Sequence, residues 1–531
     1  MPAVTPETAN VASTAADGDG VPYWSVAQQD NGSLALIPAT VDDALLDFGL
    51  CDTALAHIGF WLDNYLTSDG EIIYYTWGGV VDGVGDIGRI ASLYLKARRQ
   101  CGPGNSQWGD KYQPVLLALG RRMLELKAAG TDGRPASAQR GPRRPESKGL
   151  VAGCPEADWS HFQIDHSPDN ETWYSVNLWL QRGMEEIADF LPEGDELGVQ
   201  LRSNASVYKA QLAASIAASV VPANSSGFAH PLLLPPFARA RGEFAVFRNM
   251  TTDVRPPIEG HDLASYSNFR FLAEMLLADI LPREIEGALL SWHNTMGGRL
   301  GGVSRFMDHL DDFPSAAWAY AALNNNMTAD FHALLYGHMA TYTSRGTFHA
   351  TEQLRIESDG IKYRHYSPVY KGDVSLCVPT AVEVSRLTRW QLVFEPFRSR
   401  QVWLARAAPK RWFRDPSGFG AGDYQWRPSA EKAQPRSDVK LLPLNNGCAI
   451  AFQVSTGVAG QSATYNVTVQ RGLGNAEEGT HYVLRWPGML QRHATVGCTV
   501  VQLESAKGLV SVVPSWGLGT SVSFSVSGWW K

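Results

Sequence analysis

The spacing of apolar residues changes near residue 395, and this change limits the fold more than any other feature of the sequence. Before it, apolar residues recur at helical spacing over long segments such as 41–66 and 112–128. After it, short segments such as 448–454 and 463–469 are rich in β-branched and aromatic residues, with glycine-containing turns between them. The sequence therefore predicts an α+β chain, with a helical domain followed by an antiparallel β-domain.

The domain boundaries follow from local composition. Residues 1–22 are polar and are expected to be disordered. The helical domain is assigned to 23–395, and it contains a surface insertion at 130–149, where Arg, Pro, Ser and Gly replace nearly all apolar residues. The β-domain is assigned to 396–531. Helices are expected at 41–66 (one long helix), 86–96, 112–128, 175–191, 197–220, 262–281, 316–323 and 330–344, and strands at 401–405, 448–454, 463–469 and 522–526.

Charge and hydropathy exclude several classes of partner. The formal net charge of −7 argues against a nucleic-acid or anionic-membrane surface. No stretch reaches the roughly 18 consecutive apolar residues of a membrane span. The 17 Trp, 18 Tyr and 20 Phe residues fit sugar stacking as well as a large core. A small neutral or sugar-like partner is therefore expected, and the sequence does not indicate an oligomeric state.

Two sequence features disagree about localisation. The first residues lack the basic end and apolar run of a signal peptide, which taken literally predicts a cytoplasmic protein. Seven Asn-X-Ser/Thr sequons instead favour a secreted or endomembrane glycoprotein. They lie at Asn31, Asn170, Asn204, Asn224, Asn249, Asn326 and Asn466.

The six cysteines show neither CxxC nor Cys/His spacing, so no zinc site is expected. Cys448 and Cys498 both lie in predicted strands. A disulfide between them and two buried free thiols are equally compatible with the sequence.

The chemistry is expected in two polar segments, 304–314 and 344–353, which flank a pair of helices. Acids, arginines and histidines gather there within otherwise apolar and aromatic sequence. Glu352 stands among Phe348, His349 and Leu354, a setting that raises the pKa of a carboxyl group by desolvation.

Motifs along the chain support a family resemblance by their order. The helical part resembles the six-hairpin glycosidase superfamily, whose members fold as an (α/α)6 toroid, commonly with an appended β-sandwich. The likeness covers residues 40–520 and implies hydrolysis of a glycosidic bond in a glycan, without a cofactor. The motifs are Gly85 to Arg89, Pro155 to Asp158, Tyr174 to Trp179 with Arg182-Gly183, Ile258 to Gly260, Tyr266 to Arg270, Arg305 to Pro314, Gly346 to Gln353 and, in the β-domain, Leu404 to Phe413.

Glycoside hydrolysis needs one protonated and one ionised carboxyl group. Glu352 is the expected proton donor, with an ion pair to Arg345 or Arg355 as the structural alternative. Asp308, Asp311 or Asp86 is the expected base, with hypothetical inversion, and Asp312 is expected to cap a helix.

The remaining candidates are polar or aromatic residues near these acids. Asp86 and Arg89 are three residues apart and can form an ion pair on one helix face, a reading slightly favoured over sugar binding. Glu156 and Asp158 face the same side of an extended loop, toward a substrate or a cation, although no metal site is expected. The other substrate-binding candidates are Trp77, Tyr174, Asn177, Trp179, Glu259, Tyr266, Asn268, Arg270, Arg305, His309, Arg345 and His349.

Two other functions remain open at this stage. A polysaccharide lyase with the same toroid would use Tyr363 or His365 as its base. A non-catalytic glycan-binding protein would keep the fold without two carboxylates in one cavity.

Overall fold

The structure is a computed structural model of the 531-residue chain, and everything below concerns the residues that it describes. The segment 1–22 and most of the insertion at 130–149 lie outside them. The described residues are 36–73, 75–76, 79–80, 84–102, 105–130, 145–153, 172–221, 233–238, 266–295, 297–306, 309–343, 350–351, 353–357, 360–362, 377–399, 401–409, 442–446, 448–456, 462–470, 480–485, 489–496, 498–504, 509–514 and 521–529.

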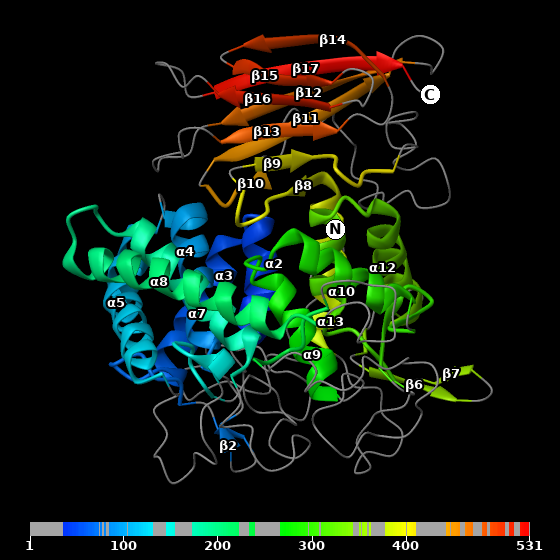
Figure 1. The fold of residues 1–531 in the computed structure, drawn as a ribbon. Coiled ribbons are helices and arrows are strands. Elements are labelled where there is room, and N and C mark those ends of the chain that lie inside the picture. Colours follow the sequence, from blue (N-terminus) through cyan, green and yellow to red (C-terminus); the bar gives the residue numbers. More distant parts are fainter. Residues whose placement is uncertain are drawn as a thin grey trace. The chain divides into compact units, whose positions relative to one another are not determined.

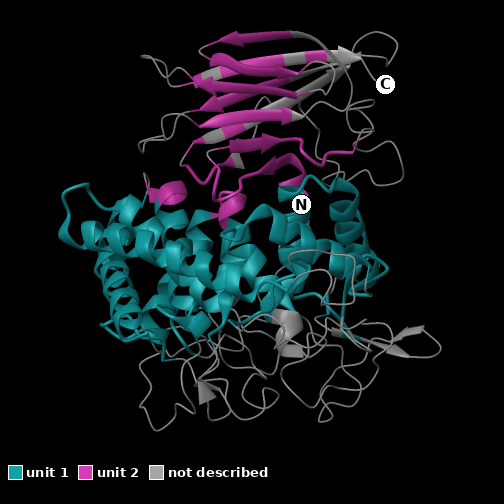
Figure 2. Ribbon diagram, in the orientation of Figure 1, with its two compact units in different colours: residues 1–45, 51–98, 105–387 teal, residues 46–50, 99–104, 388–531 magenta. Residues whose placement is uncertain are grey.

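The chain divides into two compact units, an α-rich one and a β-rich one, so the α+β class is confirmed (Figure 2). Unit 1 contains residues 1–45, 51–98 and 105–387, and unit 2 contains 46–50, 99–104 and 388–531. The helices are α2 (Leu36–Asp47), α3 (Cys51–Tyr65), α4 (Asp86–Cys101), α5 (Ser106–Ala129), α7 (Tyr174–Phe190), α8 (Glu196–Ser219), α9 (Tyr266–Leu277), α10 (Arg283–Thr295), α11 (Ser315–Asn324), α12 (Thr328–Thr341) and α13 (Val378–Leu392), as Figure 1 shows.

The expected single helix at 41–66 is two helices, α2 and α3. Gly49 lies between them with φ +72°, a left-handed conformation that ends a helix and that glycine adopts without a steric penalty. Its amide donates to the carbonyl of Leu46 at 2.9 Å. Apolar residues continue at helical spacing across this break, so periodicity alone does not reveal it.

Local sequence explains several helix ends. The Asp195 carboxylate accepts a hydrogen bond from the Gly198 amide at 2.9 Å and caps α8. Gly130 closes α5 in the left-handed conformation, with φ +68°. Gly130 is also one described end of the predicted insertion, and the other end contains a 3-10 turn, η3 (Pro145–Ser147), in which Ser147 is buried.

A small antiparallel sheet that periodicity did not predict lies in unit 1, around α11 and α12. Its strand order is β3-β4-β5-β6-β7. Val303, Leu310, Tyr342 and Leu354 form its buried core. The strands are β3 (Arg299–Leu300), β4 (Val303–Phe306), β5 (His309–Asp311), β6 (Gln353–Glu357) and β7 (Gly360–Lys362), and a separate pair is β1 (Tyr75–Thr76) with β2 (Gly79–Val80).

Unit 2 contains two five-stranded sheets, with orders β10-β11-β12-β17-β14 and β15-β16-β13-β9-β8. The four expected strands correspond to β9, β11, β12 and β17, whereas β8, β10 and β13 to β16 were not predicted. The strands are β8 (Val393–Phe394), β9 (Gln401–Leu404), β10 (Leu442–Pro443), β11 (Ala449–Thr456), β12 (Ser462–Gln470), β13 (His481–Arg485), β14 (Met489–Val496), β15 (Cys498–Glu504), β16 (Leu509–Pro514) and β17 (Ser521–Trp529).

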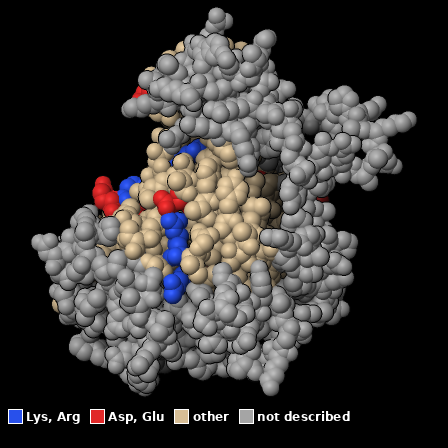
Figure 3. Space-filling model, turned by 90° about the vertical axis from the view of Figure 1, so that its right-hand side faces the viewer, with Lys and Arg blue, Asp and Glu red and all other residues tan. Residues whose placement is uncertain are grey.

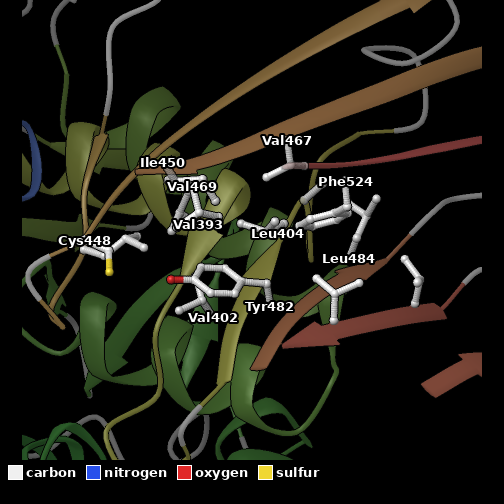
Figure 4. Close-up of a cluster of buried hydrophobic side chains, with 14 residues drawn as sticks. Val393, Val402, Leu404, Cys448, Ile450, Val467, Val469, Tyr482, Leu484 and Phe524 are labelled. Atoms are coloured by element: carbon white, nitrogen blue, oxygen red, sulfur yellow. The ribbon is translucent and has the colours of Figure 1, made fainter. Parts of the chain in front are cut away.

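Side chains from both sheets of unit 2 form one buried core. Val467 and Phe524 come from the first sheet, and Leu404 and Leu484 from the second, with the Tyr482 ring among them (Figure 4). The expected antiparallel pairing holds for the other strand pairs of unit 2, but β13 pairs with β9 in parallel. A parallel pair needs a long connection, and here the chain between the two strands forms β10, β11 and β12 of the other sheet.

The sequence left open whether Cys448 and Cys498 form a disulfide, and the structure shows that they do not. Cys377 and Cys448 are buried free thiols, and Cys498 is also free. Cys51 and Cys101 are both disulfide-bonded, which their spacing in the sequence did not indicate.

None of the described helices is both long and apolar enough to cross a membrane.

Candidate functional site

The sheet of unit 1 joins the two polar segments that flank the α11–α12 pair. In β5, His309 lies opposite Arg355 of β6, and Asp311 lies opposite Gln353. Arg305 is in β4, the neighbour of β5 on its other side. Residues that face each other across an antiparallel pair have Cα atoms about 4.5–5.5 Å apart. The pairing therefore brings Asp311 beside the strand that starts immediately after Glu352 in the sequence.

Asp311 and Asp312, at the end of β5, are both buried. An oxygen of the Asp311 carboxylate accepts a hydrogen bond from the Phe313 amide at 3.0 Å. The expectation that Asp312 caps the following helix was wrong. The N-cap of α11 is Pro314, without a side-chain cap, and the Asp312 backbone carbonyl accepts from the Ser315 amide at 2.8 Å.

Three predicted residues, Asp86, Arg89 and Trp179, lie in one buried cluster. Arg89 Nη1 is 3.3 Å from Asp86 Oδ1, so the predicted ion pair is confirmed. Arg89 Nη2 is 3.3 Å from Glu274 Oε2, and the guanidinium lies 5.0 Å from the centre of the Trp179 ring. Arg89 thus links α4, α7 and α9, and Asp86 is held by a cation on its own helix, which favours its structural role.

A second arginine, Arg182, extends this cluster along α7. Its guanidinium also lies 5.0 Å from the Trp179 ring centre. Arg182 Nη1 donates to the carbonyl of Leu277 at 3.1 Å, and Nη2 is 3.7 Å from Glu186. Trp179 therefore makes cation–π contacts with two guanidinium groups. Arg182 and Glu186 stand at helical i, i+4 spacing, which is the signal by which the sequence could have identified them.

Two glycines make this cluster possible because they allow α4 and α7 to approach closely. A Cβ atom on Gly88 would lie 2.0 Å from the carbonyl oxygen of Trp179. A Cβ atom on Gly183 would lie 2.7 Å from the Cα of Gly88. Neither position can carry a side chain unless one of the two helix backbones moves. The two glycines therefore set how closely α4 and α7 pack, and with it the position of Arg89 relative to Trp179.

Tyr174 and Asn177 are buried and use their polar groups within the protein. Asn177 Oδ1 accepts from the Val151 amide at 2.8 Å and from the hydroxyl of Tyr208, and its Nδ2 donates to two carbonyls. The Tyr174 hydroxyl bonds to Ser215 and Ser219, and burial raises its pKa to about 12. We therefore leave both residues out of the proposed site.

The structure does not describe most of the other candidates, or describes only their backbone. Tyr266, Asn268 and Arg270 lie in the first turns of α9, and His309 lies in β5, with backbone descriptions alone. The residues outside the description are Trp77, Glu156, Asp158, Glu259, Asp308, Arg345, His349 and Glu352, together with Tyr363 and His365 of the lyase alternative.

A second carboxylate cluster, which the sequence analysis missed, lies at the α9–α10 turn. Arg283 Nη1 is 2.8 Å from Asp279 Oδ1 and 2.7 Å from Glu286 Oε2. Asn325 also donates to Glu286, at 3.3 Å. Burial raises the pKa of Glu286 to about 7, although the positive charge of Arg283 acts in the opposite direction. Its sequence signal is the i, i+4 spacing of Asp279 and Arg283 and the i, i+3 spacing of Arg283 and Glu286, although Asp279 lies in the turn before α10.

Among the described residues, no group of three or more His, Cys, Asp and Glu is arranged to hold a metal ion. On the described part of the face in Figure 3, charged side chains are few. There the described surface consists mainly of uncharged residues and carries only short rows of basic and acidic side chains.

The comparisons with known proteins can now be given. Neither a family model nor a curated protein matches the sequence. Two of the similar solved structures are described here. One is the Streptomyces avermitilis alpha-L-rhamnosidase complexed with L-rhamnose, at 12% identity and a TM-score of 0.42, covering 99% of this chain and 41% of that one. The other is a glycoside hydrolase, at 10% identity and a TM-score of 0.36, covering 93% and 72%. The chain thus spans less than half the length of the first.

Proposed function

We propose that this chain is a glycoside hydrolase whose helical unit forms an (α/α)6 toroid and whose β-rich unit is a β-sandwich. The observation that carries the proposal is the antiparallel pairing of β5 with β6, in which Asp311 faces Gln353. The segment 304–314, which contains three acids, and the segment 344–353, which contains Glu352, are about 40 residues apart in the sequence, and this pairing joins strands that begin or end in them. A pair of carboxyl groups held by neighbouring backbone segments is what glycoside hydrolysis requires.

The proposed roles follow the chemistry of each group. Glu352 is the proton donor to the leaving oxygen, and Asp308 or Asp311 is the base. Asp311 has one oxygen bound to the Phe313 amide, which orients the carboxylate. His309 belongs to the same strand as Asp311, and Arg305 and Arg355 belong to the neighbouring strands β4 and β6. In this proposal the three residues supply cations and hydrogen-bond donors for hydroxyl groups of the substrate.

The buried cluster around Arg89 has a different role in this proposal. It holds α4, α7 and α9 together, and its carboxylates have arginine partners in the protein. Asp86 is therefore a structural group here. Trp77, Glu156, Asp158, Glu259, Arg345 and His349, with the α9 residues Tyr266, Asn268 and Arg270, remain proposed sugar-binding positions on the strength of the sequence analysis.

The test uses the purified full chain and a panel of neutral and acidic glycans, including α-L-rhamnosides. Reducing ends and the ultraviolet absorbance of unsaturated uronates are followed together. We expect new reducing ends without absorbance. Glu352→Gln should lower the rate by about 10²–10⁴-fold, the usual contribution of general acid–base catalysis. Glu193→Gln, which changes an exposed carboxylate on the α7–α8 loop, is the matched control and should keep full activity.

Two other results would identify a different function. Absorbance at the unsaturated uronate band would identify a lyase and direct attention to Tyr363 and His365. Binding of a glycan without turnover would identify a non-catalytic binding protein. The stereochemistry is read from the anomer released first, because inversion needs room for a water between carboxyl groups about 6.5–9.5 Å apart, and retention needs about 5–5.5 Å.

A further inference from the structure

Three of the sequons lie on described residues, and their surroundings differ. Asn204 is on α8, Asn326 is in the turn between α11 and α12, and Asn466 is on β12. An N-linked glycan is bulky and polar, so the folded chain can carry it only where the asparagine side chain reaches solvent. By this requirement, the three asparagines are not equally suited to carry a glycan.

Asn466 lies on the outward face of β12. Val467 and Val469 on this strand are buried, whereas Asn466 and Thr468 are exposed, as the period-2 alternation of a strand dictates. The residue opposite Asn466 is Ser525 on β17 and Gln453 on β11. Both polar residues of the sequon thus face solvent, and the small side chain of Ser525 leaves room for a sugar on the β17 side.

Asn326 is also exposed, in a tight connection between two helices. Its φ is +60°, and its amide donates to the carbonyl of Leu323 at 3.1 Å. Asparagine is one of the few residues other than glycine that adopt this left-handed conformation readily. The third residue of the sequon, Thr328, is the first residue of α12 and is half-buried.

Asn204 is less exposed than Asn326 and Asn466. Its side chain is half-buried, and Nδ2 donates to the carbonyl of Gln200 at 2.9 Å. The amide nitrogen that would carry the sugar is therefore directed at its own helix. A glycan at this position would have to displace that hydrogen bond.

We propose that Asn326 and Asn466 carry N-linked glycans and that Asn204 does not. In the transfer, the asparagine Nδ2 forms a bond to C1 of the first sugar and releases a proton. The bond between C1 and the diphosphate oxygen of a lipid-linked sugar donor breaks, and the lipid diphosphate leaves. The disulfide bonds of Cys51 and Cys101 are independent support, because disulfides form in the oxidising compartments where this transfer takes place.

The test expresses the full chain behind a cleavable secretion leader in eukaryotic cells. An amidase that releases N-glycans in heavy-oxygen water converts each glycosylated asparagine into labelled aspartate, which peptide mass spectrometry locates. We expect label at Asn326 and Asn466 and none at Asn204. Unlabelled Asn326 or Asn466, or a labelled Asn204, overturns the proposal.

Matched variants test whether the attachment of each glycan depends on the acceptor motif and not on a change in the fold. Thr328→Ala and Thr468→Ala keep the asparagines but destroy the acceptor motif, so each should lower the intact mass by one glycan. Thr328→Ser and Thr468→Ser keep the motif and should retain that glycan. If the alanine variants keep the full mass, the modification is not at these sequons, and the proposal is overturned.

Discussion

At the scale of single residues, Arg89 is the group on which the buried cluster depends. It is 5% exposed and has carboxylates of α4 and α9 as partners. Replacing it by glutamine leaves Asp86 and Glu274 buried without their cation. We expect Arg89→Gln to lower the free energy of unfolding by about 3–5 kcal/mol, as measured by urea denaturation.

The control for Arg89 is an ion pair of the same type at the surface. Lys209 is 63% exposed and lies 3.7 Å from Glu185. Lys209→Gln should cost less than about 1 kcal/mol, since solvent screens such pairs. Equal effects of the two substitutions would mean that Arg89 is not the centre of the cluster.

The burial of Glu286 makes the stability of the folded chain depend on pH, and it determines the sign of that dependence. Its folded-state pKa of about 7 lies above the ordinary value of 4.5, so the folded chain binds more protons than the unfolded chain between these two pH values. Stability from this group is present below pH 4.5 and is lost as the pH rises toward 7. The loss amounts to about 3 kcal/mol.

Two variants isolate that effect. Glu286→Gln removes the titrating group, and Glu284→Gln changes an exposed acid in the same turn of α10. Denaturation at several pH values should show the stability of the parent chain falling relative to Glu286→Gln over this window, while Glu284→Gln runs parallel to the parent. A constant difference between the parent and Glu286→Gln would contradict the raised pKa.

At the scale of elements, helical periodicity located most helices, but α10 and α13 were not predicted, and two further kinds of structure escaped it. Gly49 breaks a continuous apolar pattern because its conformation, not its hydropathy, ends the helix. The strands β4 to β6 are only 3–5 residues long, too short for alternation to separate them from loops. For the site, the Asp86–Arg89 pair was predictable from i, i+3 spacing, whereas Glu274 joins it through tertiary packing alone.

The contact between α4 and α7 gives a prediction at this scale. A methyl group on Gly88 would lie 2.0 Å from the carbonyl oxygen of Trp179, and a backbone atom cannot rotate away. We expect Gly88→Ala to lower the free energy of unfolding by about 3 kcal/mol, measured by thermal denaturation. Gly194→Ala, on the α7–α8 loop, meets no atom within 4 Å and should be nearly neutral. Comparable stability of the two variants would show that the helices do not pack this closely.

At the scale of the whole molecule, unit 2 is built from distant parts of the sequence. Arg389 is buried and joins three of its segments. Its Nε donates to the carbonyl of Asp47, 342 residues away in the sequence. Its Nη2 donates to Glu395 at 2.7 Å and to the carbonyl of Pro443 at 2.8 Å. No local pattern marks the short segment 46–50 as part of a β-rich unit, so the sequence predicted a single boundary near residue 395.

The guanidinium group of Arg389 allows a test of how these segments of unit 2 are held together. A lysine keeps the charge but presents one ammonium group, which cannot reach Asp47, Glu395 and Pro443 together. We expect Arg389→Lys to destabilise unit 2 by about 3 kcal/mol, because hydrogen bonds to a charged group contribute about 1.5–3 kcal/mol each. Hydrogen exchange should then be roughly a hundredfold faster in β11, β12 and β17 and unchanged in α7 and α8. Arg398→Lys, at an exposed position of the same unit, should leave both regions as they are. If exchange also accelerates in α7 and α8, Arg389 stabilises the chain as a whole, and its role is not confined to the unit that its hydrogen bonds define.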